Sequence, residues 1–202
     1  EPFHGAKSID TEISSYDNFF IPDKPTTFLT TDLWQVFLVL QELDSRGAKV
    51  HVLNSTLPQV KSLISECIEL YSGSVQWTKH YLLKNITCWD EFQQKFQGDT
   101  FDKLINLMES GLSHLKWENI CTNAKSLESD SYTIGLIEHA KNHEFKNVIL
   151  LSDILSLPST GKEDISKTIN QIYTGISRAK YSVATPGDLS GWLKDIRTHS
   201  IR

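Results

Sequence analysis

The stretch TTFLTTDLWQVFLVLQELDSRGAKVHVL, residues 26–53, places a helix-like run between two strand-like runs. Residues 26–30 and 48–53 contain the β-branched and aromatic residues that favour strands. The apolar residues of 31–47 recur at the three- and four-residue spacing of an amphipathic helix, and Gly47 follows as a terminator. A strand, a helix and a strand joined by short loops predict a right-handed parallel unit.

The same order of elements returns near the other end of the chain. KNVILLSD, residues 146–153, is almost continuously apolar, which is typical of a central parallel strand covered on both faces. A helix-like stretch follows, then a strand-like run at 181–185 and a second helix-like run at 188–196. The stripe expected to be buried by the first of these helices is Ile165, Ile169, Ile172, Ile176 and Ala179.

The middle of the chain differs from both ends because its pattern is mostly helical. Turn signals at Gly73, Gly98 and Gly111 separate helix-like runs between residues 55 and 130. We therefore expect one α/β domain over residues 1–202, with its core at about 26–54 and 131–200 and a helical insertion at about 55–130.

Composition limits the functional classes. The 202 residues are 39% hydrophobic and 22% charged, and no apolar run approaches the roughly 20 residues that cross a bilayer, so we expect a cytoplasmic protein without membrane contact. The net charge is −5, while residues 141–202 hold 9 Lys/Arg against 6 Asp/Glu. No strong basic stripe is present, so any contact with nucleic acid would be local or shared with another domain.

Three cysteines and two histidines were considered as metal ligands. Cys67, Cys88 and Cys121 are scattered without C-x-x-C spacing, which favours buried free thiols over a disulfide framework or a zinc site. His139 and His143 are four residues apart and could share a metal if both lay on one helix, but no third ligand is evident. Histidines at a helix end are the preferred interpretation, and we expect no metal site.

Two further sequences bear on ligand binding. LSLPSTGKED, residues 155–164, only partly resembles a phosphate-binding loop, since Ser156 and Glu163 replace the first Gly and the final Ser/Thr of G-x-x-x-x-G-K-[ST]. Asp153 follows an apolar strand, at the end where ligands of open α/β sheets bind, and it could equally be a solvated turn residue. The solvated turn is the preferred interpretation, so self-contained catalysis is poorly supported.

The helix near the C-terminus carries a polar face. Gln171, Thr174, Gly175 and Arg178 recur at helical spacing away from the isoleucine stripe. This face combines one cation with small polar groups and a glycine that permits close approach. A guanidinium held there could bind a phosphate through two parallel hydrogen bonds.

Two segments carry a resemblance to a known family. SYTIGLIEHAKNHEFKNVILLSD (131–153) and NQIYTGISRAKYSVAT (170–185) resemble the last two motifs of the UvrD/Rep-like superfamily 1 DNA helicases, roughly T-x-H-x-x-K-G-L-E-F and Y-V-A-x-T-R-A-K. Residues 26–54 also resemble the strand and helix that open the family's second RecA-like domain. The resemblance implies a RecA-like three-layer α/β fold with a parallel central sheet. The spacing between the two motifs makes the pair more specific than either motif alone.

The resemblance also implies roles for individual residues. Arg178 matches the arginine finger on the ATP γ-phosphate, and Glu144 matches the acid that hydrogen-bonds the ribose. Lys141 and Asn142 occupy the K-G pair and are expected on the nucleic-acid side. The other residues expected at ATP are Gln171, Thr174 and Gly175.

Several positions depart from the family pattern. Leu136, Glu138 and Asn142 replace the family's Thr, His and Gly, and Thr30 replaces an Arg near the domain start. Each change removes a donor or a small group near the DNA strand, and Glu138 adds a charge that phosphates repel. We expect single-stranded or partly duplex DNA as a partner, but not through the family's usual contacts.

The expected function is the C-terminal motor half of an ATP-dependent DNA helicase or translocase. ATP and Mg²⁺ would bind only together with an N-terminal RecA-like domain, because the phosphate-binding lysine and the magnesium-binding acids belong to that domain in the family. The chain begins with Glu and is expected to be part of a longer protein, inactive alone. The alternative is a degenerate helicase-like domain that acts as a non-catalytic interaction or scaffold module.

Overall fold

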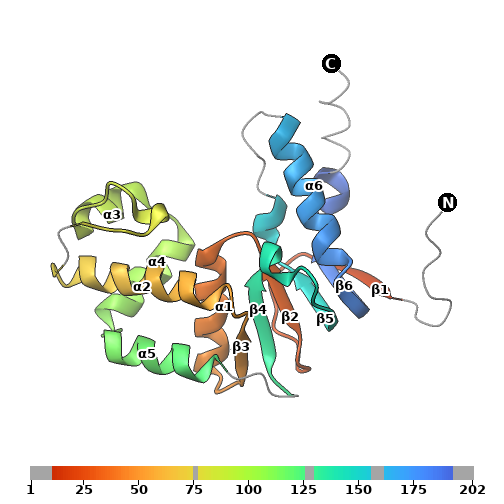
Figure 1. The fold of residues 1–202 in the computed structure, drawn as a ribbon, viewed down its shortest axis with the longest axis horizontal. Helices are drawn as coiled ribbons and strands as arrows, with labels where there is room; N and C mark the ends of the chain where they lie inside the picture. Colours follow the sequence, from red (N-terminus) through yellow and green to blue (C-terminus); the bar gives the residue numbers. More distant parts are fainter. Residues whose placement is uncertain (1–10, 75–76, 126–129, 156–161, 193–202) are drawn as a thin grey trace. The chain divides into compact units, whose positions relative to one another are not determined.

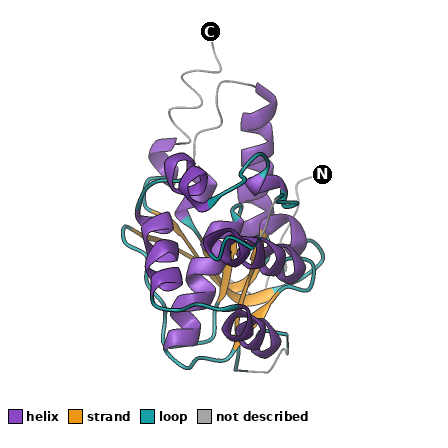
Figure 2. Ribbon diagram, turned by 90° about the vertical axis from the view of Figure 1, so that its left-hand side faces the viewer, coloured by secondary structure: helices purple, strands orange, loops and turns teal. Residues whose placement is uncertain are grey.

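The computed structural model describes residues 11–74, 77–125, 130–155 and 162–192. The chain divides into two compact units, which we describe separately. The sheet unit comprises Glu1–Asp32 and Asp130–Arg202, and the helical unit comprises Leu33–Ser129. Figure 2 separates helices from strands by colour and shows that regular elements make up most of the described chain.

The described residues of the sheet unit form five strands. Their order is β1-β6-β5-β2-β4, which can be followed in Figure 1. Every pairing among these five strands is parallel. The strands are β1 (Glu12–Tyr16), β2 (Thr27–Thr30), β4 (Tyr132–Leu136), β5 (Phe145–Leu150) and β6 (Ala179–Pro186). The α/β class with a parallel central sheet, predicted from the sequence, is confirmed and is consistent with a RecA-like fold.

Strand β2 pairs with β4 on one edge and β5 on the other, and all four of its residues are buried. Phe28 is in register with Ile134 of β4 on one side and with Ile149 of β5 on the other. These three side chains are at most 2% exposed, so they form the middle of the core. The apolar runs of the sequence are therefore explained by strands with neighbours on both edges.

Helix α6 (Lys162–Ile176) follows β5 through the short helix η3 (Ser152–Leu155) and leads into β6. It packs against β5, β6 and a second short helix, η2 (Ile137–Ala140). Its described buried residues are Thr168, Ile172 and Gly175, at the spacing of one helical face.

This buried face corrects the predicted isoleucine stripe, because Ile169 is 41% exposed. Gly175 lies on the buried face, and a Cβ at this position would meet Leu150 Cδ2 at 2.6 Å. The glycine therefore permits close approach of the helix to β5 and does not face a ligand.

The helical unit begins earlier than the predicted insertion, since it includes the first helix and the following strand. Its compactness comes from contacts of α1 with α2, α4 and β3, and of α2 with α5. Val52 N also donates a hydrogen bond to Ala124 O at 2.9 Å, which ties β3 to the end of α5. The elements are α1 (Leu33–Ser45), β3 (Val50–Val52), α2 (Leu57–Tyr71), η1 (Tyr81–Leu83), α3 (Trp89–Lys95), α4 (Asp99–Glu109) and α5 (His114–Asn123).

Aromatic side chains form much of the core of the helical unit. Trp34 of α1 lies 6.1 Å from Phe92 and 5.1 Å from Phe101, measured between ring centroids. Phe92 also stacks on Trp89 at 4.8 Å and contacts Phe96 at the same distance. The rings join α1, α3 and α4, so aromatic packing stabilises three helices at once.

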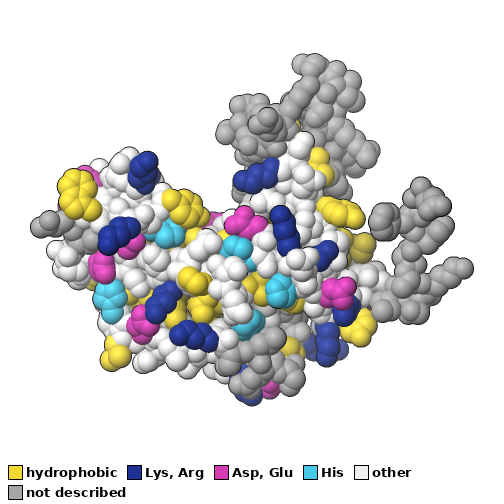
Figure 3. All heavy atoms as spheres, viewed as in Figure 1, with side chains coloured by type: hydrophobic (Ala, Val, Ile, Leu, Met, Phe, Trp, Pro, Cys, Tyr) yellow, Lys and Arg dark blue, Asp and Glu magenta, His cyan; other side chains and the backbone are white. Residues whose placement is uncertain are grey.

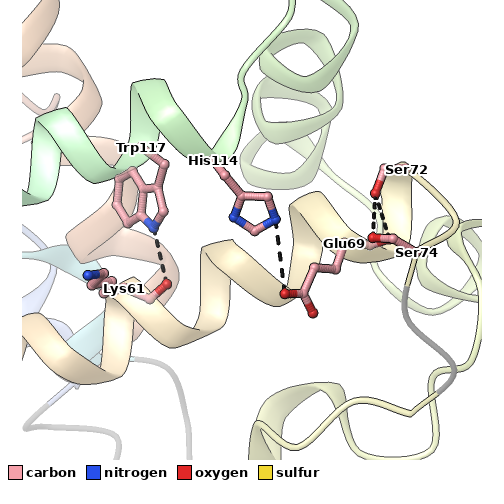
Figure 4. Close-up of polar contacts among 6 residues, drawn as sticks. All are labelled: Lys61, Glu69, Ser72, Ser74, His114 and Trp117. Atoms are coloured by element: carbon pink, nitrogen blue, oxygen red, sulfur yellow. Dashed lines mark hydrogen bonds and ion pairs between the residues drawn. The ribbon is translucent and has the colours of Figure 1, made fainter.

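Helices α2 and α5 are joined by a second set of contacts, drawn in Figure 4. Trp117 is fully buried, and its Nε1 donates a hydrogen bond to the carbonyl oxygen of Lys61 at 3.1 Å. Farther along the same pair of helices, His114 Nε2 lies 4.0 Å from Glu69 Oε1. The indole satisfies its donor inside the core, as buried tryptophans usually do.

The three cysteines differ in burial. Cys67 and Cys121 are buried free cysteines, as predicted, whereas Cys88 is exposed because it immediately precedes α3 at the surface. Among the described residues, no helix is both long and apolar enough to span a membrane.

Candidate functional site

Arg178 lies just after α6, immediately before β6. Its Nη1 donates a hydrogen bond to His143 O at 3.3 Å, and its Nη2 donates to Ser177 Oγ at 3.1 Å. Its Nε is buried and has no hydrogen-bond partner among the described residues. The arginine backbone is also anchored, since Phe145 N donates to Arg178 O at 2.8 Å. The guanidinium is therefore held beside the start of β5 with donor capacity left over.

Glu144 lies beside this arginine, immediately before β5. Lys180 Nζ is 2.8 Å from Glu144 Oε2. The hydrogen bond from Lys180 lowers the pKa of Glu144 below its ordinary value, and the charges of Lys180 and Arg178 add to this effect. The carboxylate consequently stays ionised and presents acceptor oxygens next to two cations.

The turn that carries Glu144 has an unusual backbone. Asn142 has a φ of 68°, in the left-handed region that favours glycine, and His143 N donates to Ala140 O at 3.1 Å. Asn tolerates this conformation better than most residues. The position that corresponds to the family's Gly thus has the conformation that a glycine would adopt without strain.

A pocket of about 560 Å³ lies between η2 and α6. From η2 and the residue after it, Glu138 and Lys141 line the pocket. From α6, Lys167, Gln171 and Thr174 line the opposite side. The same two segments of chain continue to Glu144 and Arg178, respectively. The pocket combines two lysines with amide and hydroxyl groups, which suits an anionic ligand.

The structure brings together most of the residues proposed from the sequence, although in a different grouping. Lys141, assigned to nucleic acid, shares the pocket with Gln171 and Thr174, assigned to ATP. Arg178 and Glu144 lie beside each other, as expected from the two motifs. Gly175 is the exception, because it packs against the sheet.

The positions that depart from the family pattern also differ in accessibility. Leu136 is buried, and Thr30 is fully buried, with its Oγ1 accepting a hydrogen bond from Asp32 N at 3.0 Å. Glu138 is exposed and lies 3.6 Å from His139 Nε2. Neither Leu136 nor Thr30 is positioned to contact a nucleic-acid strand in this conformation.

The two histidines considered as metal ligands lie among the described residues. His139 lies on the short helix η2, and His143 lies beyond its end, so the two do not share an α-helical face. No cluster of three or more His, Cys, Asp or Glu side chains that could hold a metal occurs among the described residues. Most of the stretch 155–164 lies outside the part of the chain that the structure describes.

Asp153 turns out to be a structural residue between strand ends and not a solvated turn residue. Its Oδ2 accepts hydrogen bonds from Thr31 N at 2.7 Å and Thr31 Oγ1 at 2.6 Å, which ties the end of β5 to the end of β2. Burial raises the pKa of Asp153, although the hydrogen bonds from Thr31 oppose this shift. Nearby, Tyr16 Oη donates to Leu150 O at 2.6 Å.

Sequence reasoning did not identify Lys180 or Lys167 as site residues. Lys180 follows Arg178 by two positions at the start of a strand, and this spacing places side chains on the same face of a strand. Lys167 precedes Gln171 and Thr174 by four and seven positions on α6, the spacing of one helical face. Both signals were present in the sequence.

Comparisons with known proteins add no relative to this description. No protein-family model matches the chain, and no curated protein matches it. The resemblance to UvrD/Rep-like helicases therefore rests on the spacing of the two motifs. The parallel sheet and the proximity of Arg178 to Glu144 are compatible with that resemblance, and the functional assignment is a proposal.

Proposed function

We propose that the sheet unit is the C-terminal motor half of an ATP-dependent DNA helicase or translocase, supplying an arginine finger to ATP bound by a second RecA-like domain. The observation that carries this proposal is the proximity of Arg178 to Glu144 near the starts of two neighbouring strands, since Arg178 donates a hydrogen bond to the carbonyl oxygen of His143, the residue before Glu144. A cation for the γ-phosphate and an acceptor for a ribose then lie side by side. Both belong to the two motifs whose joint spacing suggested them.

The chemistry of the two side chains fits a nucleotide. A guanidinium offers a planar set of donors to phosphate oxygens, and Nη1 and Nη2 of Arg178 each carry two N–H groups, with one bond to His143 O and one to Ser177 Oγ respectively. Glu144 is ionised, so it can accept hydrogen bonds from hydroxyl groups. Lys180 engages one oxygen of Glu144 and holds that carboxylate in place.

The pocket between η2 and α6 extends the positive character of this site. Lys141 and Lys167 line it together with Gln171 and Thr174. Lysines attract phosphates, and amide or hydroxyl groups bind phosphate oxygens and sugars. Glu138 lines the same side as Lys141 and opposes phosphate binding there, so nucleic acid is expected to contact the pocket at Lys167 on the α6 side.

In this proposal, the residues that hold ATP and Mg²⁺ come from both domains. Bound ATP with Mg²⁺ supplies the γ-phosphoryl group that is transferred to water. The residues of the sheet unit fit the phosphates and the ribose, because they are two cations and a carboxylate. They do not fit Mg²⁺, since no described cluster of acidic side chains could hold a metal. The metal and the phosphate cradle are assigned to the second domain.

A second candidate function is a helicase-like interaction or scaffold module without catalysis. The burial of Leu136 and Thr30, together with the acidic Glu138 in the pocket, favours this alternative, because these positions carry DNA contacts in the family. In that case, Arg178 is a structural residue that stabilises the turn before β5 through His143 O.

The deciding experiment is steady-state ATP hydrolysis by the protein that contains this chain together with its second RecA-like domain. Arg178→Ala should lower kcat by about 10³ to 10⁵ with little change in ATP affinity, because an arginine finger acts on charge that develops in the transition state. Arg178→Lys should restore little, because it keeps the charge and loses the planar set of donors. Arg46→Ala is the matched control, since Arg46 is exposed and pairs with Glu42 in the helical unit.

The two candidate functions give opposite results in this experiment. If Arg178 is structural, Ala should lower the melting temperature and leave kcat per folded molecule nearly unchanged. The chain by itself should hydrolyse no ATP, because phosphoryl transfer also needs a phosphate cradle and Mg²⁺. Turnover by the purified chain would contradict the assignment of a motor half.

A further inference from the structure

The loop Trp77–Lys84 of the helical unit exposes two large aromatic side chains. Trp77 is 74% exposed and Tyr81 is 64% exposed. Most large apolar side chains of this unit are instead packed into its core, Trp34, Phe92 and Trp117 among them. The two exposed rings, which lie within five residues of each other, make this loop a candidate surface for contact.

The backbone of this loop is fixed. Glu66 of α2 accepts hydrogen bonds at its Oε2 from Lys79 N at 2.8 Å and from His80 N at 2.9 Å. Thr78 Oγ1 donates to Leu83 O at 2.6 Å and also contacts Ile86 O at 3.1 Å. These bonds hold the two ends of the loop together, so ordering it would cost little on binding.

The ring of Tyr81 is oriented by a buried neighbour. His80 is 8% exposed and stacks on Tyr81 with 4.7 Å between ring centroids and 29° between ring planes. His80 Nδ1 accepts a hydrogen bond from Leu82 N at 3.3 Å, which fixes the imidazole. One side of the tyrosine ring is therefore supported, and the ring remains largely accessible to a planar ligand.

The loop itself carries two lysines and no acidic side chain. Residues 71–89 contain no Asp or Glu, although the chain as a whole has a net charge of −5. Lys79 and Lys84 are both exposed and lie within the loop. Glu66, the acidic residue that contacts the loop, is already engaged by two backbone N–H groups. An anionic partner with flat, stackable groups would match both features.

From this combination we infer that the loop Trp77–Lys84 binds single-stranded nucleic acid, with bases stacked on Trp77 and Tyr81 and phosphates near Lys79 and Lys84. Aromatic rings interleaved with lysines are the arrangement with which proteins bind single strands without sequence preference. On the face drawn in Figure 3, hydrophobic side chains form separate spots among charged ones. A duplex offers its bases only at its ends, so it binds such rings poorly.

The test measures binding of fluorescently labelled twenty-nucleotide oligo(dT) and oligo(U) to the full chain by fluorescence anisotropy. Trp77→Ala should weaken binding about 10-fold, since stacking on one ring contributes roughly 1–3 kcal/mol per base and 1.4 kcal/mol is tenfold. Trp77→Phe should recover most of the affinity. Replacing Lys79 and Lys84 together with Gln should lower the magnitude of the salt slope by about 1.4, at about 0.7 per phosphate contact.

Leu115→Ala is the matched control, because Leu115 is 73% exposed in the same unit and lies outside the loop. This variant should bind like the wild type, and thermal melts should show that all variants are folded. Binding of either oligonucleotide that depends on Trp77 supports the inference and identifies DNA or RNA as the tighter ligand. Three results would overturn it: no binding by the wild type, unchanged binding by Trp77→Ala, or equal affinity for a duplex of the same length. The inference does not rest on the proposed ATP site, which lies in the sheet unit.

Discussion

The sheet unit and the helical unit bury different kinds of side chain. In the sheet unit, hydroxyl groups accompany the apolar core: Thr26, Thr27, Thr30, Ser131, Thr133, Thr168 and Thr185 are all buried. In the helical unit, aromatic rings on α1, α3 and α4 contact one another. The first arrangement depends on hydrogen bonds between strand ends, and the second on the fit of large rings.

This difference separates the two candidate activities of the chain. Polar groups held at the ends of strands can be aimed at a reacting phosphate, as Arg178 and Glu144 are in our proposal. In the helical unit, the rings of Trp77 and Tyr81 lie outside the core and are exposed, and our inference assigns them to bases. Positioned charge suits catalysis, and exposed rings suit contact with bases.

The largest expected effect on stability comes from the removal of an aromatic ring of the helical unit. Phe92→Ala should lower the free energy of unfolding by about 3–5 kcal/mol, because Phe92 is fully buried and contacts four other rings. Tryptophan fluorescence during urea unfolding measures this effect, since four of the five tryptophans lie in the helical unit. Leu115→Ala should change stability by less than about 0.5 kcal/mol. Equal losses for both would contradict the importance assigned to aromatic packing.

A smaller loss is expected where α6 approaches the sheet. Gly175→Val should cost about 1–3 kcal/mol, because a Cβ there would meet Leu150 Cδ2 at 2.6 Å and Leu150 is fully buried. The double variant Gly175→Val/Leu150→Ala should lose less than the sum of the two single variants, since the cavity receives the added methyl groups. Thermal or urea unfolding of the four proteins measures the coupling. If the stability losses of the two single variants simply add in the double variant, the close approach of Gly175 to Leu150 does not limit the stability.

Replacement of Asp153 should change how stability depends on pH. Burial raises the pKa of this carboxyl above its ordinary 3.8. The stabilising contribution of the protonated carboxyl is therefore complete below pH 3.8, and it is lost as pH rises through the raised pKa. The side chain of Asp153→Asn cannot ionise but keeps an acceptor for Thr31. The free energy of unfolding of the variant should therefore increase relative to that of the wild type as pH rises. The difference should be on the order of 1 kcal/mol. Parallel stability curves from pH 3 to 7 would rule out a raised pKa.

The smallest effect concerns an ion pair on the surface of the helical unit. Lys61 Nζ lies 2.7 Å from Glu118 Oε2, but both side chains are partly exposed. Glu118→Gln should cost about 0.2–1 kcal/mol at low salt, because solvent screens such pairs. The loss should shrink further in 1 M salt, where the Debye length is about 3 Å. A cost comparable with that of Phe92→Ala would reverse the order in which packing and surface charge stabilise this unit.

Much of the sheet could be predicted because its strands have strong local patterns. Residues 26–30 and 146–153 are apolar enough to indicate buried strands, and both correspond to central strands of the sheet unit. Strand β1 was missed because EISSY has no alternation and its residues are mostly exposed. Only its pairing with β6 makes it a strand, and that partner lies far away in the sequence.

The candidate site was predicted in part for a similar reason. Motif spacing suggested Arg178 and Glu144, which the fold brings together, because the spacing reflects a turn, a strand and a helix of fixed length. The orientation of α6 could not be obtained from its isoleucines. Residues at helical spacing can be grouped into more than one helix face. Because Gly175 has no side chain, the helix face that contains it can approach Leu150 closely.

The pairing of β1 with β6 also affects how the chain folds during synthesis. Glu12 is in register with Ser182, and Thr185 Oγ1 donates to Ser14 O across 171 positions of sequence. At about 5–20 residues per second, a ribosome needs roughly 10–35 s to make the intervening chain. During that interval β1 lacks its partner strand β6, so the β1–β6 pair cannot form until almost the whole described chain has been made.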